Sequence, residues 1–485
     1  MNHHHLMPAR KALPCLFLFA LICLFSSCEK DNPEVSDNSH EIISLTLRKA
    51  NGSVIDSSTV SVTIVNDTIR VTVPEETDLT ALTPVIIISG ISISPASGVQ
   101  QDFSSPVQYT VTAEDGSQGI YTVIIKNAIP ANLVFFGSGD NSFYALNAKT
   151  GALKWKYSST ASFAYSSPTY KDGVVYVGGI DNYVYAFKAS TGEVLWKQLT
   201  GQTGIESDAV IHGNTVYVGN NDDDFMALDA QTGNLKWSFR TGSNVSSSAV
   251  IFQNLVCFGS SDGNMYALDT ATGRYVWHYQ TNAMINQSAA CLYNETLYVG
   301  SRDRNLYAID AQTGILKWSY PAGVSLEACS PTVANNRVYM GGWYNFPGNQ
   351  EAGSFFALDA VTGNLVWNKL ENTGFSSSPC VANNIVYIGA DDLYFYALNA
   401  ANGETLWKKQ LLTNSASASV SDGIVYIGGG GTHNFYALDA LNGNEKWRFP
   451  VQNGLMTSTP LILDSNGFPN QPSNYGVDGQ QVGKR

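Results

Sequence analysis

Four side chains with oxygen donors stand in or beside short runs of small residues that recur along the chain: Glu206, Asp208, Asn286 and Glu327. Carboxylate and amide oxygens are the ligands that calcium takes in proteins, and about six to eight of them must converge on one ion. The four residues come from three separate segments of the chain, and polar side chains around a wet interior are common. We therefore expect an interior that is partly acidic and holds no metal.

Patterns for zinc and for redox chemistry are not found after the leader of the chain. Neither a His-x-x-x-His nor a Cys-x-x-Cys spacing occurs there, so zinc is not supported. The four cysteines that follow the leader are never adjacent, and each lies in an apolar run. We expect buried, unreactive side chains at Cys257, Cys291, Cys329 and Cys380.

A leader occupies the first residues. Arg10 and Lys11 precede an apolar run from Leu13 to Phe25, which is short for a membrane span and typical of a signal peptide. Ser26, Ser27 and Cys28 follow, and small residues before a cysteine resemble the lipobox of bacterial lipoproteins. The resemblance implies removal of residues 1–27 and acylation of Cys28. Ordinary cleavage, with Cys28 an incidental thiol, is the alternative.

Acylation at Cys28 would tether the mature chain to a membrane, because two or three acyl chains hold a protein stably. Glu29, Lys30 and Asp31 follow the cysteine, and this start resembles the export signal of Bacteroidetes surface lipoproteins. The resemblance implies an outer-membrane lipoprotein at the cell surface, with the periplasmic face as the alternative. Residues 28–40 are polar and predict a linker.

The composition excludes several partners and classes. The 485 residues carry 27 Lys and Arg against 40 Asp and Glu, a net charge of −13, which disfavours nucleic acid. With 44% hydrophobic residues the chain can bury a large core, so disorder is excluded. The length predicts more than one domain.

Residues 41–127 predict a small β-sandwich. Val60–Val65 and Thr68–Val73 alternate apolar and polar residues around Asn66-Asp67, which is a hairpin signal. Further strands are expected at Val85–Ser89, Val107–Ala113 and Tyr121–Ile125. The segment from Leu79 through Ser94-Pro95 and Asp102-Phe103-Ser104 to Gly116 resembles the immunoglobulin-like module of many Bacteroidetes surface lipoproteins, which implies a passive stalk.

Residues 131–464 repeat one unit eight times. Eight tryptophans recur at spacings of 41, 41, 40, 41, 49, 40 and 40: Trp155, Trp196, Trp237, Trp277, Trp318, Trp367, Trp407 and Trp447. Each unit holds four short alternating runs with turns between them, which predicts a blade of a β-propeller. Most units also have an aspartate in a turn after the second run, which we interpret as turn chemistry.

The two ends of this region predict how the ring closes. The first unit, from Leu133 to Trp155, lacks an inner run, and an unattached inner run, Ser458–Leu463, follows the last tryptophan. Pairing the two completes the first blade and removes the exposed edges of an open array. The sequence therefore predicts an all-β chain with an eight-bladed propeller closed by both its ends. Residues 465–485 are expected to form a flexible tail.

The phrase Ala-x-Asp-x-x-Thr-Gly-x-x-x-Trp resembles the pyrroloquinoline-quinone (PQQ) type propeller repeat, in which it forms a girdle of docked tryptophans. Dehydrogenases of that type carry adjacent cysteines, a calcium site and long insertions over the cofactor. This chain lacks adjacent cysteines and has one sizeable insertion, so we expect no cofactor. A PQQ- and calcium-dependent dehydrogenase is the alternative.

That insertion runs from Gly342 to Gly353 and contains Trp343, Tyr344 and Phe346. Aromatic residues on a loop are candidate anchors for a protein or a sugar ring, although they could instead pack on a neighbouring blade. With Glu206 and Glu327 they are the candidate binding residues. We expect a non-enzymatic envelope scaffold that binds a protein or a glycan. The chain also resembles the propeller lipoprotein of the outer-membrane barrel-assembly machinery, which implies an assembly factor as a second alternative.

Overall fold

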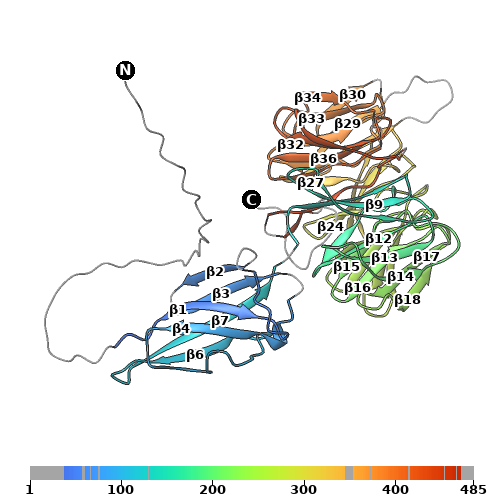
Figure 1. Ribbon diagram of the computed structural model, residues 1–485. Coiled ribbons are helices and arrows are strands. Elements are labelled where there is room, and N and C mark those ends of the chain that lie inside the picture. The colour runs from blue at the N-terminus through green and yellow to red at the C-terminus, as the bar shows by residue number, and fades with distance from the viewer. Residues whose placement is uncertain are drawn as a thin grey trace, which may run out of the picture. The chain divides into compact units, whose positions relative to one another are not determined.

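The computed structural model describes residues 38–470 except 57–59, 66, 75–76, 129, 344–352, 372, 413–414, 453 and 466. The chain divides into two compact units, Met1–Ala128 and Ile129–Arg485. Apart from the short 3-10 turn η2 (Leu79–Ala81), the named elements are strands (Figure 1). In the described part of the chain, no helix has the length and apolar character needed to cross a membrane. The all-β class predicted from the sequence is confirmed.

The first unit is a small β domain of two sheets. One sheet has the order β2-β3-β7-β6-β5 and the other pairs β1 with β4. The predicted hairpin is β2 and β3, paired from Ser61–Thr72 to Val65–Thr68, and β3 runs parallel to β7. Buried residues of both sheets, including Leu47, Ile86 and Tyr109, share one core. The strands are β1 Ile42–Arg48, β2 Ser61–Val65, β3 Thr68–Val73, β4 Thr83–Ile88, β5 Ser92–Ser94, β6 Val107–Thr112 and β7 Gln118–Asn127.

The second unit is a β-propeller of eight antiparallel sheets, each with four blade strands that are numbered here from the inner edge outwards. The sheet of blade one has a fifth strand beside its first. Blade one combines β39 Leu461–Leu463, β8 Leu133–Ser138, β9 Ser142–Asn147 and β10 Leu153–Ser158. Blade two is β11 Thr169–Lys171, β12 Val174–Gly178, β13 Tyr183–Lys188 and β14 Val194–Leu199. Blade three is β15 Val210–His212, β16 Thr215–Gly219, β17 Asp224–Asp229 and β18 Leu235–Arg240. Blade four is β19 Val250–Phe252, β20 Leu255–Gly259, β21 Asn264–Asp269 and β22 Tyr275–Gln280.

The remaining blades follow the same plan. Blade five is β23 Cys291–Tyr293, β24 Thr296–Gly300, β25 Asn305–Asp310 and β26 Leu316–Pro321. Blade six is β27 Thr332–Ala334, β28 Arg337–Trp343, β29 Gly353–Asp359 and β30 Leu365–Glu371. Blade seven is β31 Cys380–Ala382, β32 Ile385–Gly389, β33 Tyr394–Asn399 and β34 Thr405–Gln410. Blade eight is β35 Ser419–Ser421, β36 Ile424–Gly429, β37 Asn434–Asp439 and β38 Glu445–Pro450.

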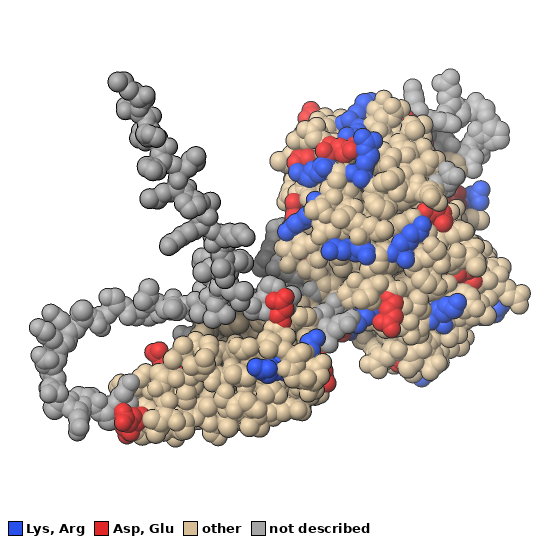
Figure 2. Space-filling model, viewed as in Figure 1, with Lys and Arg blue, Asp and Glu red and all other residues tan. Residues whose placement is uncertain are grey.

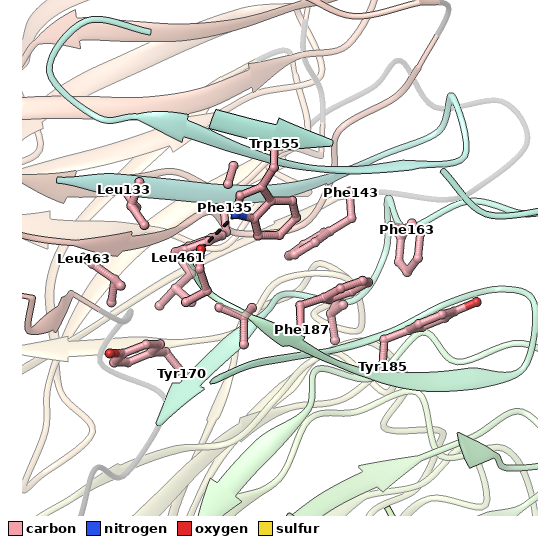
Figure 3. Close-up of a cluster of buried hydrophobic side chains, with 14 residues drawn as sticks. Leu133, Phe135, Phe143, Trp155, Phe163, Tyr170, Tyr185, Phe187, Leu461 and Leu463 are labelled. Carbon is pink, nitrogen blue, oxygen red and sulfur yellow. Dashed lines mark hydrogen bonds between the residues drawn. The ribbon is translucent and has the colours of Figure 1, made fainter. Parts of the chain in front are cut away.

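The two ends of the propeller close the ring, as the sequence predicts. β39 pairs with β8, with Leu461 opposite Phe135 and Leu463 opposite Leu133. Figure 3 shows both leucines beside the aromatic core between blades one and two, which includes Phe143 and Phe187. The last blade is bound to the first as well, because the Trp447 indole Nε1 donates to the Ala148 carbonyl at 3.1 Å.

The recurring phrase of the repeat holds neighbouring blades together. The tryptophan indole of each blade lies on a glycine of the next blade, whose φ is between +70° and +75°. A Cβ at these glycines would lie within 2.8 Å of an indole atom, so the position admits no larger residue. In seven blades the indole Nε1 also donates to the carbonyl of the residue that directly follows the next blade's third strand, for example from Trp155 to Ala189 at 2.8 Å.

The predicted flexible tail begins with ordered structure, which corrects that expectation for its first residues. Strand β40 (Pro469–Asn470) pairs with β39, with Asn470 opposite Ile462. The Asp464 carboxylate accepts the Phe468 backbone N–H at 2.9 Å and so stabilises the turn that returns the chain. The rest of the expected tail lies outside the described residues.

Substitutions at two glycines of blade eight distinguish the effect of the docked indole on stability from the effect of backbone strain. Gly443 (φ +72°) lies on the Trp407 indole, whereas Gly423 (φ +71°) has nothing within 4 Å of an added Cβ. We expect Gly423→Ala to lower the free energy of unfolding by about 1–2 kcal/mol, since alanine disfavours this φ. Gly443→Ala should lower it by a further ~1–3 kcal/mol, because the indole must also move. Urea unfolding measures both; equal losses would contradict the docking role.

Candidate functional site

One end of the propeller collects the candidate binding residues. Turns between the second and third strands of a blade lie at the same end as the segments that lead from a fourth strand to the next blade. We call this end the entry face. Glu206 lies between β14 and β15, Glu327 lies between β26 and β27, and Trp343 is the last residue of β28. All three therefore belong to the entry face.

A belt of hydrogen bonds joins the blades just inside this face. At six of the junctions between blades, a backbone N–H of one inner run donates to the side chain at the same position of the next blade's inner run. Thr459 donates to Ser167 Oγ, and Ser167 to Asp208 Oδ1. Asp208 in turn donates to Ser248 Oγ at 2.9 Å, and three more junctions, from Ala289 to Ser417, repeat the contact. The small residues of the inner runs therefore bind blade to blade.

Asp208 is the acidic member of this belt. Burial raises the pKa of its carboxyl from 3.8 to about 6, and the hydrogen bonds from Ser167 and Ser248 offset part of that rise. The residue as a whole is partly exposed, but its carboxyl lies in surroundings that desolvate it. Its role in the structure is that of an acceptor for the neighbouring blade.

The other oxygen donors each have their own surroundings. Glu327 forms an ion pair with Arg302 at 3.7 Å, and burial raises its carboxyl pKa while the guanidinium opposes the rise. Asn286 Oδ1 accepts the Ser261 hydroxyl at 3.4 Å. Glu206 is half-buried three blades away from Glu327. The fold therefore distributes these groups around the ring and does not bring them to one place.

This distribution does not fit a calcium–quinone centre. Within the part of the chain that the structure describes, no group of three or more His, Cys, Asp and Glu side chains could hold a metal ion. The carboxylates of Asp208 and Glu327 are engaged by a backbone N–H and by a guanidinium. A divalent ion needs several oxygens that converge on it, and this arrangement supplies none.

The cysteines lie in four different blades and cannot pair with one another. Cys257, Cys291 and Cys329 are buried and free, and Cys380 is partly buried. Burial raises the pKa of the Cys291 and Cys329 thiols to about 12, so they are not thiolates at neutral pH. Cys329 Sγ accepts the Gly341 N–H at 3.4 Å, where other blades use a serine. These are structural side chains.

Trp343 stands apart from the girdle tryptophans. It pairs with Ser325 through two backbone hydrogen bonds, 2.9 Å from the Ser325 N–H and 3.1 Å from its own. Its side chain is partly exposed, yet its Nε1 is buried and has no hydrogen-bond partner among the described residues. Ser325 Oγ is in the same state. Tyr344 and Phe346, the other predicted anchors, lie outside the described residues.

The turn aspartates of the entry face have a second role that the sequence analysis missed. In five blades the carboxylate accepts the hydroxyl of a tyrosine four residues later, as in Asp303 and Tyr307 at 2.7 Å. The same carboxylates cap the turn, for example by accepting the Asn305 N–H at 3.0 Å. The recurrence of a tyrosine at this spacing is visible in the sequence and would have revealed the pair.

The viewed side of the second unit carries scattered charges of both signs among uncharged residues, and no large patch of one sign (Figure 2). Such a surface offers little long-range electrostatic steering. Contacts on it would depend on shape, hydrogen bonds and exposed apolar groups.

Together these features define a closed propeller whose inner polar groups serve to hold the ring. A family model described as outer membrane protein assembly factor BamB matches residues 110–207, 181–345, 283–389 and 351–466. The chain belongs to this family of PQQ-like propeller repeats. A second model, described as SGBP, N-terminal, matches residues 42–125, the small β domain. No curated protein matches the chain.

Solved structures support the fold alone, because their identities are low. BamB from Moraxella catarrhalis is 20% identical, with a TM-score of 0.53, and the match covers 62% of this chain and 89% of that one. The quinohemoprotein alcohol dehydrogenase from Comamonas testosteroni is 16% identical, with a TM-score of 0.51 and coverage of 70% and 72%. The computationally designed protein Ika8 is 19% identical, with a TM-score of 0.53 and coverage of 67% and 95%.

The raised pKa of Asp208 predicts a pH-dependent stability. Between pH about 4 and about 6 the folded protein keeps a proton on Asp208 that the unfolded chain has lost, so stability falls as pH rises through this window. Relative to Asp208→Asn, the wild type should lose about 2 kcal/mol of unfolding free energy between pH 4 and pH 7. Urea unfolding across this range measures the difference; a constant difference would contradict the assignment.

Asp222→Asn is the matched control with the opposite sign. Backbone hydrogen bonds from Gln202 and Thr203 lower the pKa of the partly exposed Asp222 carboxyl below 3.8. The wild type should therefore lose stability relative to Asp222→Asn only when the pH falls below about 4.

Proposed function

We propose that this chain is a non-enzymatic scaffold of the cell envelope whose propeller binds a protein or a glycan at the entry face. The observation that carries the proposal is the hydrogen-bond belt. Inner polar groups that could serve chemistry are instead used to join blades, as at Asp208 and Ser330. Glu327 is held by Arg302. What the ring offers to a ligand is therefore its turns and connecting segments.

The blade-six corner is the contact region that we favour. We define it as Trp343, Ser325, Glu327 and Arg302. Trp343 contributes a partly exposed indole and Ser325 a buried hydroxyl, both with unused hydrogen-bonding atoms. Ser325 precedes Glu327 by two residues, and Glu327 forms the ion pair with Arg302. An aromatic face with polar groups beside it suits either an aromatic or arginine side chain of a protein or the hydroxyl-bearing face of a sugar.

The envelope assignment rests on the leader and on the two family models. Acylation of Cys28, which lies outside the described residues, would anchor the chain at the outer membrane. The small β domain, in our proposal an immunoglobulin-like stalk, would then separate the propeller from the lipid. Both the surface and the periplasmic face agree with this arrangement. The lipoprotein export start at Glu29–Asp31 favours the surface.

A role in outer-membrane protein assembly is the second candidate. It is favoured by the family model for an outer membrane protein assembly factor, whose matches together extend from residue 110 to residue 466. In that case the ligand of the entry face is an outer-membrane protein. A quinone-dependent dehydrogenase has no comparable support from the residues at the inner edge.

The blade-six corner can be tested with two aromatic substitutions. Trp343→Ala should weaken binding at least about tenfold, since hot-spot aromatics commonly supply that much. Tyr275→Ala removes an exposed aromatic from the outer strand β22 and should leave binding unchanged. The measurements are capture of solubilised outer-membrane proteins by the acylated chain and affinity electrophoresis in polysaccharide-containing gels. Unchanged binding by Trp343→Ala, with unchanged melting, would reject the corner.

The enzymatic alternative has its own assay. Incubation of the full chain with PQQ and calcium, followed by dye reduction with alcohols and sugars, should give no turnover. Turnover that depends on both additives would overturn the scaffold proposal.

A further inference from the structure

Three kinds of polar contact join neighbouring blades of the propeller. The first is the girdle bond from an indole Nε1 to a carbonyl of the next blade. The second is a tyrosine hydroxyl from the second strand that donates to the same carbonyl, as Tyr298 and Trp318 both do to Ala360 at 2.8 and 3.2 Å. The third is the belt bond of the inner runs.

The interface between blades four and five lacks all three. The Trp277 Nε1 is buried and has no hydrogen-bond partner among the described residues. Cys257 occupies the position that holds a tyrosine in six blades. Ala289 occupies the belt position of blade five, so the side chain offers no acceptor to blade four.

The other interfaces keep at least two of these contacts. Between blades one and two, Phe135 replaces the tyrosine, but Trp155 and the Thr459–Ser167 belt bond remain. At the junction of the two chain ends, Trp447 and Tyr426 both donate to Ala148, at 3.1 and 3.0 Å. The interface between blades eight and one therefore keeps two of the three contacts. The interface that lacks them, between blades four and five, lies on the opposite side of the ring.

What remains between blades four and five is mainly apolar packing. Cys257, Trp277, Ile285 and Tyr307 belong to one buried cluster that spans both blades. Other hydrogen bonds still cross: from Ser247 Oγ to the Ser288 carbonyl at 3.0 Å, from Ser261 to Asn286 at 3.4 Å and from the Ile285 N–H to the Ser260 carbonyl at 3.1 Å. A buried donor with no partner destabilises the closed form, because water satisfies that donor once the interface opens.

We propose that the propeller opens first between blades four and five, and not at the junction of its two ends. This opening is a local one, in which the two blades separate while each keeps its own sheet. Local openings of this kind occur at the least stable contacts of a fold and precede global unfolding. The proposal is independent of the function proposed above.

The native cysteines report on different interfaces. Cys257 belongs to the cluster between blades four and five, whereas Cys291 and Cys329 belong to the cluster between blades five and six. All three side chains are buried, with exposed fractions of 1% or less. A thiol reagent therefore reaches each one only when its own interface opens.

The test is thiol labelling of the folded full-length chain, with each site quantified by peptide mass spectrometry. We expect Cys257 to react about tenfold faster than Cys291 and Cys329, as the loss of more than one hydrogen bond at an interface implies. Equal rates at the three sites would mean that they open together, and a faster rate at Cys291 or Cys329 would place the first opening elsewhere. Either result overturns the proposal.

Two substitutions at the belt form a matched pair. Ala289→Ser supplies the missing acceptor and should slow labelling of Cys257 severalfold, with no change at Cys291. Ser330→Ala removes the acceptor of the Ala289 N–H at the next interface and should speed labelling of Cys291, with no change at Cys257. If Ala289→Ser leaves Cys257 unchanged while Ser330→Ala acts as expected, the belt deficit is not the cause of the opening and the proposal fails.

Discussion

The contact between a tryptophan of one blade and the turn of the next is the interaction on which the propeller depends. Each blade is a small twisted sheet that buries its two faces only against its neighbours. The indole covers a left-handed glycine, and its Nε1 reaches a carbonyl beside it, as Trp407 does with Gly443 and Ala440. One residue thus supplies both apolar burial and a directional bond. The repeat places that residue at the same height in every blade.

This construction explains why the inner edge carries polar residues without forming a catalytic centre. The first strand of each of the eight blades has only three residues, so little ladder bonding is available near the axis. Side-chain acceptors such as Ser167 and Asp208 replace it by binding the backbone of the preceding blade. An acid in this belt is therefore explained by assembly of the ring, even though its pKa is raised as catalytic groups often are.

The sequence predicts the eight-bladed ring but not the individual contacts between its blades. Tryptophan spacing was enough for the number of blades, because it is a recurrence that one sequence displays. The unattached run Ser458–Leu463 was enough for the closure, because the first unit lacks such a run. The belt was missed because the serines of the inner runs were interpreted as small residues and not as hydrogen-bond acceptors. Strand β40 was missed because two residues carry no periodic signal. Strand β1 alternates apolar and polar residues over Ile43–Arg48, so its sequence could have revealed it. The separation of Glu206 from Glu327 follows from blade order, which the repeat count does supply.

Differences among the eight copies of the repeat show which interfaces and turns have properties that the consensus sequence does not predict. A repeat tolerates loss of one contact where a neighbour compensates, as at Phe135 beside an intact Trp155 bond. At blades four and five the losses coincide in Cys257, Trp277 and Ala289. Ser247 and Ser261 still bond across by their side chains, but they do not restore the girdle, tyrosine or belt contact. At blade six the departure is of another kind, since Trp343 adds an indole outside the girdle with an unused donor. Deviations from the consensus at the interfaces between blades therefore affect the stability of the ring. A deviation at a turn of the entry face affects what the ring can bind.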